Sequence, residues 1–439
     1  TISFSSDYIL YLGDYMLRKV KGVRDILPPE SIKFTYVIEK FRKIVSRFGY
    51  EEIITPTLEY FELFEKKSGV EISKTMYVFK DKKGLILALR PEVTPSIARI
   101  YINYLKSSPL PVRLFYVANC FRYEEPQRAR YREFWQAGVE CIGLKEPYGE
   151  LETLTMVDTL MNELKIPVSI RIGDMAIWRS IFDYYLIPDE KQQLLFTALD
   201  KGDNETFTNL VQEYVPPKAI NMFQRLMQIK GSNVSSLCAE CRRILSDYGF
   251  SEIEGRIDFI EELSLSLKLS RNSRIILDMG FARGLAYYTG IIFEVYSSNL
   301  DVAIGGGGRY DSLIEVFGGP PTPAIGFAIG VDRVSMALNY DVKTSPRILL
   351  VPVKPEYISA ALNAQVILAR KGMCTELEYK RDLRKALKYA NNRDIPFVAI
   401  IGSEFVSEGK VTIKDMMRRT QHVISLEKIA DIVAGQGSS

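Results

Sequence analysis

The sequence predicts a protein of mixed α and β structure, with a helical insertion in its middle and a separate α/β domain at its end. Three observations support this prediction. Residues 112–143 form two strand-like segments joined by a charged loop, residues 178–267 show helical spacing without alternation, and strands and helices alternate from Arg347 onwards. A chain of 439 residues with 47% hydrophobic and 25% charged residues suits about two to four globular domains.

The charge of the chain is nearly balanced, but its distribution is uneven. Lysine and arginine number 57 against 54 aspartate and glutamate residues, which gives a net charge of +3. From Arg347 to the end there are 15 basic and 10 acidic residues, so this region alone carries +5. The total neither requires nor excludes a nucleic-acid partner, because a local basic surface matters more. Such a surface is expected in the C-terminal region.

Histidine and cysteine usage argues against several kinds of site. The only histidine is His422, so histidine triads, histidine-ligated zinc and histidine proton relays are not expected. The five cysteines are odd in number and scattered, which indicates a reducing cytoplasm rather than a disulfide framework. Cys238 and Cys241 have zinc spacing, but no second pair and no nearby histidine accompany them, so no metal site is predicted.

The sequence also argues against a membrane location. No apolar run approaches the length that would span a bilayer. Residues 1–19 contain Asp7 and Asp14 and lack a basic start, so they are interpreted as an N-terminal extension and not as a secretory signal.

The first long element is an amphipathic helix over residues 31–48, followed by a strand over residues 51–55 that ends at Pro56. A proline there suits a sheet edge or a strand terminus. Two interpretations stay open, a dimer surface and an ordinary helix-strand unit of the core.

A buried strand is predicted over residues 85–89. It leads into Arg90-Pro91-Glu92-Val93-Thr94-Pro95, in which Glu92 and Thr94 can face the same way at a period of two. These two side chains belong either to a site or to a turn cap.

The hairpin at residues 112–143 carries two different faces on its second strand. One face is apolar and the other is polar in mid-strand, with Phe134, Gln136, Gly138 and Glu140. The polar face is either exposed to water or the floor of a ligand site. Gly138 favours a floor, because glycine weakens a strand but leaves room for a ligand.

The middle of the chain is predicted to contain a helix and a strand, then a long helical segment, and then a glycine-containing stretch that leads into a strand. A helix is predicted over residues 150–164 and a strand over residues 168–173, before the helical segment that ends near residue 267. Next comes Arg283-Gly284-Leu285-Ala286-Tyr287-Tyr288-Thr289-Gly290 and a strand. Here a cation and two phenols lie between glycines, so the stretch is either a site or the end of a core strand.

Two further glycine-containing segments follow. Residues 305–308 are four glycines, which match neither a phosphate-binding Walker loop nor a dinucleotide fingerprint, and which would let a strand lie against a flat ligand. The second segment is a strand-to-helix turn that places Arg333 on the first turns of a helix, either over a base or in solvent.

The last domain begins after a boundary at residues 341–346. Strands are predicted at residues 347–352, 397–402 and 410–414, and helices at residues 359–370, 381–391 and 426–433. This alternation predicts an α/β domain of about 90 residues with a largely parallel sheet. The basic helix at residues 381–391 suggests a polyanion partner, although a solvated face is the commoner meaning.

Taken together, these segments resemble class II aminoacyl-tRNA synthetases, and specifically the histidyl-tRNA synthetase family, over about residues 20–432. Lys21-Gly22-Val23-Arg24-Asp25 is similar to the family's opening. The helix that ends at Pro56, residues 121–134 and residues 326–333 are similar to the three motifs of the class. The stretch at Arg283 and the glycine run ending at Tyr310 resemble the two histidine-specific signature peptides.

The resemblance implies the fold and its division into domains. The catalytic domain would be α+β, an antiparallel sheet flanked by helices, built from residues 20–174 and 271–341. A helical insertion would occupy residues 175–270, and an α/β anticodon-binding domain residues 346–439.

The resemblance also implies a role for each site residue. Histidine would be held by Glu92, the backbone at Val93, Thr94, Gln136, Glu140, Tyr287 and Tyr288, with Glu140 and Tyr288 reading the imidazole. ATP would be bound by Arg122, Arg130, Phe134, Arg283 and Arg333. Arg122 and Arg283 would be the catalytic pair at the α-phosphate, and Mg²⁺ would be held by phosphate oxygens without a dedicated protein site.

The activity implied is histidine activation with ATP, followed by transfer to the histidine tRNA, in a cytoplasmic homodimer. A non-catalytic, histidine-binding regulatory paralogue of histidine biosynthesis is the alternative, but that type lacks the anticodon-type domain that this chain retains. A synthetase for another amino acid would leave Glu140 and Tyr288 unexplained. One departure from the family concerns Ala286, where many members carry an acidic residue.

Overall fold

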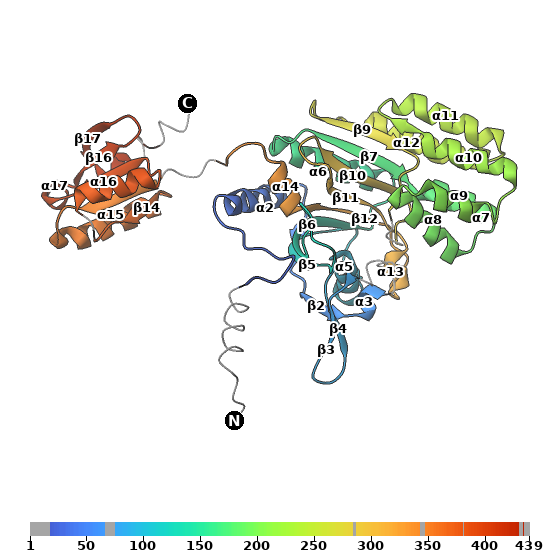
Figure 1. The fold of residues 1–439 in the computed structure, drawn as a ribbon, viewed down its shortest axis with the longest axis horizontal. Coiled ribbons are helices and arrows are strands. Elements are labelled where there is room, and N and C mark those ends of the chain that lie inside the picture. Colours follow the sequence, from blue (N-terminus) through green and yellow to red (C-terminus); the bar gives the residue numbers. More distant parts are fainter. Residues whose placement is uncertain are drawn as a thin grey trace. The chain divides into compact units, whose positions relative to one another are not determined.

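The computed structural model describes residues 18–65, 75–283, 287–342, 347–380, 382–429 and 433. Position 286, where the sequence departs from the family, and most of the N-terminal extension lie outside the described residues. The chain divides into two compact units, Thr1–Asp341 and Val342–Ser439 (Figure 1). Among the helices described, none is long and apolar enough to cross a membrane.

The larger unit is built on a nine-stranded sheet in the order β1-β5-β6-β12-β11-β10-β7-β9-β8. Only β1 with β5 and β7 with β9 pair in parallel, so the sheet is mainly antiparallel, as the family resemblance implies. Its strands are β1 (Glu51–Glu52), β5 (Val112–Phe121), β6 (Glu133–Ile142), β7 (Val168–Asp174), β8 (Lys230–Gly231), β9 (Ser273–Asp278), β10 (Ile291–Ser297), β11 (Ala303–Arg309) and β12 (Ala324–Gly330).

Three helices pack together along this sheet: α2 (Glu30–Arg47), α6 (Tyr148–Glu163) and α14 (Val331–Ala337). The apolar residues of α2 recur at helical spacing, and its Phe41 meets Phe115 and Phe327 of the sheet. The helix ends before Gly49, whose φ of +82° is the left-handed conformation that glycine adopts at a helix C-terminus. The second strand of the predicted hairpin has its apolar face covered, and Trp135 contacts Phe34 of α2.

A smaller sheet is formed by strands from the N-terminal part of the chain. It has the order β2 (Leu58–Tyr60), β4 (Ile86–Leu89) and β3 (Val78–Lys80), and the short helices nearby are α3 (Glu62–Glu65), α5 (Thr94–Ile100), η1 (Tyr101–Leu105) and α13 (Leu313–Val316). Figure 1 shows β3 and β4 projecting away from the larger sheet. The prediction of a buried strand here is wrong in part, because Ala88 is fully buried while Leu85 and Ile86 are exposed.

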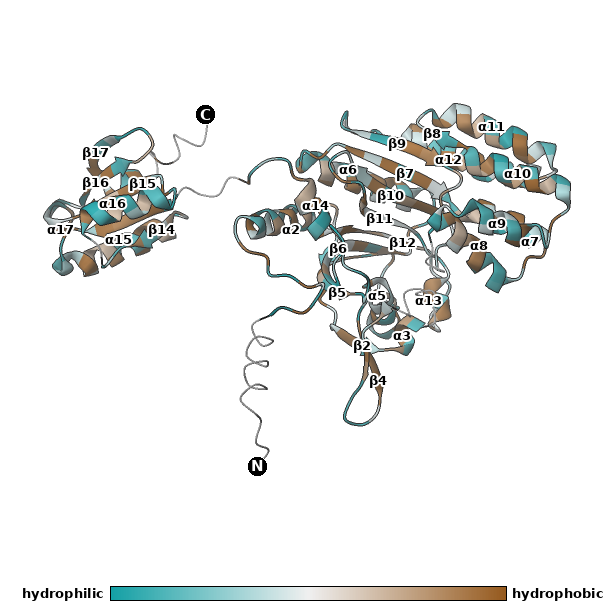
Figure 2. Ribbon diagram, in the orientation of Figure 1, coloured by the Kyte–Doolittle hydropathy of each residue, from teal (hydrophilic) through white to brown (hydrophobic). Residues whose placement is uncertain are grey.

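The predicted insertion is helical, and it packs in the same compact unit as the nine-stranded sheet. Its helices are α7 (Met175–Tyr184), α8 (Asp189–Lys201), α9 (Asn204–Val211), α10 (Pro217–Gln228), α11 (Val234–Asp247), η2 (Ser251–Ile253) and α12 (Glu254–Ser266). Trp178, Phe182, Phe207 and Phe223 form an aromatic cluster inside it. Figure 2 shows hydrophobic and hydrophilic residues alternating on these helices, as expected for amphipathic packing.

The C-terminal unit has a five-stranded sheet in the order β14-β13-β15-β16-β17. Its elements are β13 (Arg347–Pro352), η3 (Pro355–Tyr357), α15 (Ile358–Arg370), β14 (Cys374–Leu377), α16 (Leu383–Asn392), β15 (Phe397–Ile401), α17 (Ser403–Glu408), β16 (Lys410–Asp415), β17 (Thr420–Ser425) and η4 (Leu426–Lys428). The prediction of a largely parallel sheet is wrong: β13 pairs in parallel with β14 and β15, but β15 with β16 and β16 with β17 are antiparallel.

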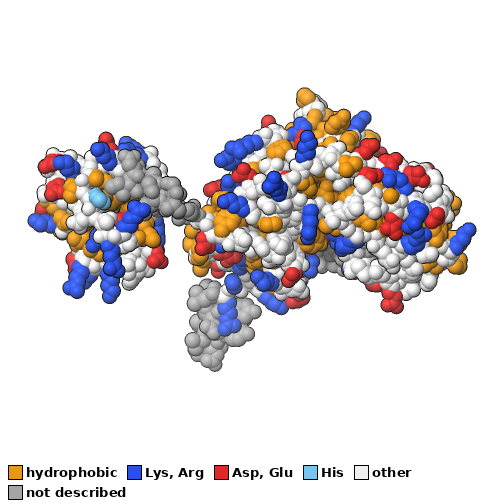
Figure 3. Space-filling model, turned by 90° about the horizontal axis from the view of Figure 1, so that it is seen from above, with side chains coloured by type: hydrophobic (Ala, Val, Ile, Leu, Met, Phe, Trp, Pro, Cys, Tyr) orange, Lys and Arg blue, Asp and Glu red, His pale blue; other side chains and the backbone are white. Residues whose placement is uncertain are grey.

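Basic side chains are prominent on the surface of the C-terminal unit, as Figure 3 shows. Arg384, Lys385 and Lys388 of α16 are exposed, while Ala386 and Ala390 on the same helix are buried. The predicted basic helix is therefore present, with its cationic side toward solvent. His422 is also exposed.

Candidate active site

One cavity is lined by strands β6, β10, β11 and β12, the start of α5 and the loop between β5 and β6. All predicted site residues line it except Val93, whose side chain is fully buried. The polar face of β6 points into this cavity, so Phe134, Gln136 and Glu140 belong to its floor and are not a solvated outer face. The cavity therefore gathers residues from segments that are far apart in the sequence.

Glu140 is fixed by two hydroxyl groups. Thr94 Oγ1 donates to Glu140 Oε1 at 2.6 Å, and the Tyr310 hydroxyl donates to Glu140 Oε2. Burial raises the pKa of Glu140 to about 7, although both hydroxyl donors act to lower it. The Thr94 hydroxyl is directed at Glu140 on the cavity floor, so Thr94 belongs to the cavity lining.

Glu92 is buried and accepts a hydrogen bond of 2.9 Å from the Tyr287 hydroxyl. The ring of Tyr287 contacts those of Tyr288 and Tyr310, at centroid distances of 4.9 and 5.8 Å. Burial raises the pKa of Tyr288 to about 12, so its hydroxyl is a neutral donor at physiological pH. One pocket thus combines two carboxylates, Glu92 and Glu140, with the hydroxyl groups of Tyr287, Tyr288 and Tyr310.

Gln136 lies on the same floor and accepts a weak hydrogen bond of 3.4 Å from the Cys120 thiol. Burial raises the pKa of Cys120 to about 12, which keeps this thiol protonated and able to donate. The Gln136 amide oxygen is thus oriented by the protein, and its amide nitrogen can donate to a ligand in the cavity.

Arg122 and Arg130 lie on the loop that joins β5 to β6. Arg122 Nε donates to the carbonyl of Pro91 at 3.0 Å, and its guanidinium lies 5.4 Å from the ring centroid of Phe134. Arg130 Nε forms an ion pair of 2.5 Å with Glu124, and its side chain is about half exposed. Both cations face the cavity, where they can meet an anionic ligand.

Arg283 forms an ion pair of 3.4 Å between its Nη1 and Glu294 Oε1 of β10. A Cβ added at Gly306 would lie only 2.3 Å from that nitrogen and 2.7 Å from the Phe293 carbonyl. The absence of a side chain at Gly306 therefore leaves the space that the Arg283 guanidinium occupies. The glycine run has a steric reason, because β11 lies close to its neighbours and to a cavity arginine.

Arg333 is held by two backbone carbonyls. Its Nε donates to Ala129 at 3.0 Å and its Nη1 donates to Ala303 at 2.8 Å, which joins the β5–β6 loop to the start of β11. Burial, with Arg130 and Arg122 nearby, lowers its pKa. The alternative of a solvated Arg333 is therefore wrong.

Several site residues were not found by sequence reasoning. Tyr116 is fully buried in the cavity wall, and a Cβ at Gly138 would lie 2.5 Å from its hydroxyl. The mid-strand Gly138 was the signal that could have pointed to a large neighbour. Asp332 accepts from the Trp135 amide at 2.8 Å and from Arg24 Nη2 at 2.7 Å, so Asp332 links Arg24 of the opening segment to the start of β6.

The described residues contain no group of three histidine, cysteine, aspartate or glutamate side chains that could hold a metal ion. All five cysteines are free, and only Cys374 is exposed. Burial raises the pKa of Cys238 and Cys241 to about 11 and 12, which opposes the thiolate form that zinc requires.

Comparison with known proteins agrees with this geometry. The family model for histidyl-tRNA synthetase matches residues 22–334, and that for an anticodon binding domain matches residues 347–436. The histidine–tRNA ligase of Methanocaldococcus jannaschii is 40% identical over 420 residues, covering 95% of this chain and 99% of the relative. That of Sulfolobus acidocaldarius is 38% identical over 423 residues, covering 94% and 97%.

Solved structures share the fold. Histidyl-tRNA synthetase from Nostoc sp. PCC 7120 has a TM-score of 0.80 at 20% identity, over 96% of this chain and 99% of that chain. A Bacillus halodurans C protein described as an ATP phosphoribosyltransferase regulatory subunit/histidyl-tRNA synthetase has a TM-score of 0.73 at 23% identity, over 88% and 98%. With the two matched domains and the near full-length relatives, the chain belongs to the histidyl-tRNA synthetase family of aminoacyl-tRNA ligases.

Proposed function

We propose that this chain activates L-histidine with ATP to form histidyl-adenylate and pyrophosphate, and then transfers the histidyl group to the 3′ end of its tRNA. The observation that carries the proposal is the composition of the cavity. Buried carboxylates and phenols line it together with four arginines, which provides hydrogen bonds for an amino acid and positive charge for a polyphosphate.

The first step needs positioning and charge neutralisation more than acid/base chemistry. One carboxylate oxygen of histidine attacks the α-phosphorus of ATP in line, and the bond to pyrophosphate breaks. The nucleophile is already ionised, so no general base is required. Arg122 and Arg283 neutralise the charge at the α-phosphate, and Arg130 binds the γ-phosphate. Phe134 and Arg333 enclose the adenine, since one offers an aromatic face and the other a planar cation.

Histidine is selected by hydrogen bonds to both ends of the amino acid. Glu140 and Tyr288 contact the imidazole nitrogens, and Tyr287 shapes the pocket around them. Glu92, Thr94 and Gln136, with the backbone at Val93, hold the α-amino end. An apolar competitor would offer no imidazole nitrogens to Glu140 and Tyr288, so the hydrogen bonds that these buried groups can make to the ligand would be lost, which is a strong basis for rejection.

Mg²⁺ ions would accompany the nucleotide and would withdraw charge from its phosphates. Glu124 and Glu294 are the cavity carboxylates beside the phosphate-binding arginines, and they would supply the protein oxygens.

The C-terminal unit would bind the tRNA through the cations of α16, because phosphate contacts dominate affinity for nucleic acids. Free, mostly buried thiols support a reducing location such as the cytoplasm. The regulatory alternative is disfavoured, because the anticodon binding domain is matched and the cavity retains its arginines.

A homodimer is proposed through the outer edge of the nine-stranded sheet. β1 is the terminal strand in the order, so its outer edge has no strand partner within the described chain. Beside it Ile54 is 91% exposed, and further exposed apolar residues occur on the small sheet, namely Leu58, Tyr60, Val78, Phe79 and Ile86. A surface of this kind is typical of a protein interface, and a second copy of the chain would cover it.

The deciding experiment is ATP–pyrophosphate exchange with each amino acid in turn. Histidine should support exchange and the other amino acids should not. Absence of histidine-dependent exchange would contradict the proposed activity, whereas exchange without tRNA charging would restrict it to the first step.

A further inference from the structure

The residues 287–290, which carry two cavity phenols, are attached to the helical insertion. Arg179 of α7 donates from Nη2 to the carbonyl of Tyr288 at 3.1 Å. The amide of Met175, the first residue of α7, donates to the carbonyl of Gly290 at 3.0 Å. The insertion therefore contacts the backbone on which Tyr288 is mounted.

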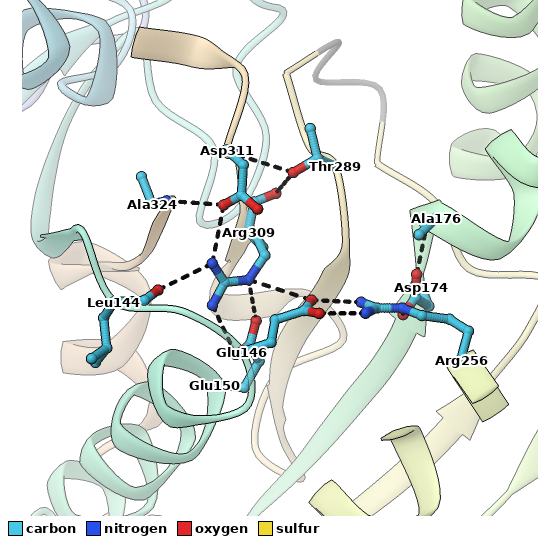
Figure 4. A network of polar contacts seen from close by, with 10 residues as sticks. All are labelled: Leu144, Glu146, Glu150, Asp174, Ala176, Arg256, Thr289, Arg309, Asp311 and Ala324. Atoms are coloured by element: carbon cyan, nitrogen blue, oxygen red, sulfur yellow. Dashed lines mark hydrogen bonds and ion pairs between the residues drawn. The ribbon is translucent and has the colours of Figure 1, made fainter. Parts of the chain in front are cut away.

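A second connection runs through a charged network, which Figure 4 shows in full. Arg256 of α12 binds both oxygens of Glu146, at 2.6 and 2.8 Å, and also Asp174 at the end of β7. Glu146 Oε1 lies 3.4 Å from Arg309 Nε. Arg309 binds both oxygens of Glu150, and only 2% of its side chain is exposed.

Arg309 in turn fixes both signature segments. Its carbonyl accepts from the Thr289 amide at 2.8 Å, and its Nη1 contacts Asp311 at 3.0 Å. Asp311 donates from its own amide to the Thr289 hydroxyl at 3.0 Å. The residue next to Arg309 is Tyr310, whose hydroxyl donates to Glu140.

Gly290 packs closely against this network, which leaves little space for a side chain at position 290. A Cβ added there would lie 3.1 Å from both Arg256 Nη2 and Glu146 Oε1. The position of the 287–290 peptide and the position of the charged groups are therefore mutually dependent.

We infer that Arg256 and Arg179 are positioning residues for the histidine pocket, through which two helices of the insertion hold Tyr288 and Tyr310 in register with Glu140. Neither arginine lines the cavity, so both act through the groups that they orient. This inference rests on the proposed assignment of histidine to that pocket. According to this inference, the helical insertion contributes to amino-acid binding as well as packing as a unit of its own.

The test is pyrophosphate exchange by the full chain, with the KM for histidine and the KM for ATP measured separately. The test variants are Arg256→Gln, and Arg179→Lys as the milder change, because a lysine keeps the charge but loses the fork geometry. Displacement of the pocket should raise the KM for histidine about 10- to 100-fold and leave the KM for ATP unchanged. Arg256→Lys should restore part of the loss, since it keeps a cation beside Glu146.

The matched control is Arg242→Gln. Arg242 belongs to α11 of the same insertion and pairs with Asp258 and Glu261 of α12, outside the network of Arg256, Glu146 and Arg309. It should leave both KM values unchanged. A loss of folded protein lowers the apparent kcat without changing KM, so the readout separates positioning from stability.

Tyr288→Phe serves as the positive control for the pocket itself. If it raises the KM for histidine while Arg256→Gln and Arg179→Lys behave like Arg242→Gln, the network is only structural and the inference is overturned, with the proposed function intact. If Tyr288→Phe has no effect, the pocket assignment fails and the inference fails with it.

Discussion

The Thr94 hydroxyl donates a hydrogen bond of 2.6 Å to Glu140 Oε1, which ties the start of α5 to the floor of the cavity. The carboxylate is buried, and burial raises its pKa from 4.5 to about 7. The hydrogen bond from Thr94 thus favours the ionised form of Glu140, whereas burial favours the protonated form.

This balance predicts a pH-dependent contribution of Glu140 to stability. Its pKa is higher in the folded state, so its contribution to the free energy of unfolding is fully present below pH 4.5 and is lost as the pH rises to about 7. The loss should be about 3 kcal/mol at about 1.4 kcal/mol per pKa unit, and it should be absent in Glu140→Gln. Urea unfolding across this pH range measures it.

Thr94→Val is the control for this prediction. It removes a donor that stabilises the carboxylate, so the loss of stability should extend to higher pH than in the wild type. Identical pH profiles for the wild type and Glu140→Gln would contradict the raised pKa.

Arg283→Ala should lower the rate of histidine activation about 10²- to 10³-fold, the usual effect of losing one donor that stabilises transition-state charge. Histidine binding should remain largely intact, because Arg283 pairs with Glu294 and not with the carboxylates of the histidine pocket. Single-turnover adenylate formation and histidine titration measure the two effects. An unchanged activation rate would refute the role of Arg283.

Gly306→Ala should reproduce part of that defect without removing the cation. The added methyl group would lie 2.3 Å from Arg283 Nη1 and 2.7 Å from the Phe293 carbonyl, so the guanidinium must move. A displacement of about 1 Å can cost about 10²-fold in rate. Gly255→Ala on α12 is the control, because nothing lies within 4 Å of its added Cβ. Equal activation rates in the two variants would show that Arg283 tolerates the displacement.

Ile54→Asp should convert the proposed dimer to a monomer, because a charge buried in an apolar interface has no partner there. Ile54 is 91% exposed in the isolated chain, so the folded monomer should tolerate the change. Sedimentation measures the mass of each form. Leu265→Asp is the control, since Leu265 is 71% exposed on α12 of the insertion. A monomeric wild type would contradict the proposed assembly.

Elements with a strong local period were predictable from the sequence. The amphipathic helix, the long hairpin and the helical insertion all carry their spacing in the sequence itself. The hairpin of β16 and β17 was not predicted, because it turns at Met416-Met417-Arg418-Arg419 with no glycine, proline or asparagine to mark it. The antiparallel pairing of β15 with β16 was missed because the alternation of strands and helices is typical of a parallel sheet.

The candidate site was predictable where residue type and glycine spacing coincide, as at Arg283. The sequence does not indicate which residues that are far apart in the chain contact each other. Tyr310 lies 170 positions from Glu140 and Arg309 lies 159 positions from Glu150, and each pair forms a buried hydrogen bond. Such pairings depend on the order of strands in the sheet, and local periodicity carries no information on that order.

The C-terminal unit should affect the second step alone. Arg384→Glu and Lys388→Glu reverse two charges on α16 while the buried face of the helix, at Ala386 and Ala390, stays the same. The KM for tRNA should rise, and the slope of log affinity against log salt should become shallower by about one for each phosphate that is no longer neutralised. Pyrophosphate exchange is the internal control and should be unchanged, because these cations lie in the unit that does not contain the cavity. Deletion of this unit should likewise spare exchange and abolish efficient charging, and undiminished charging after either change would contradict tRNA binding here.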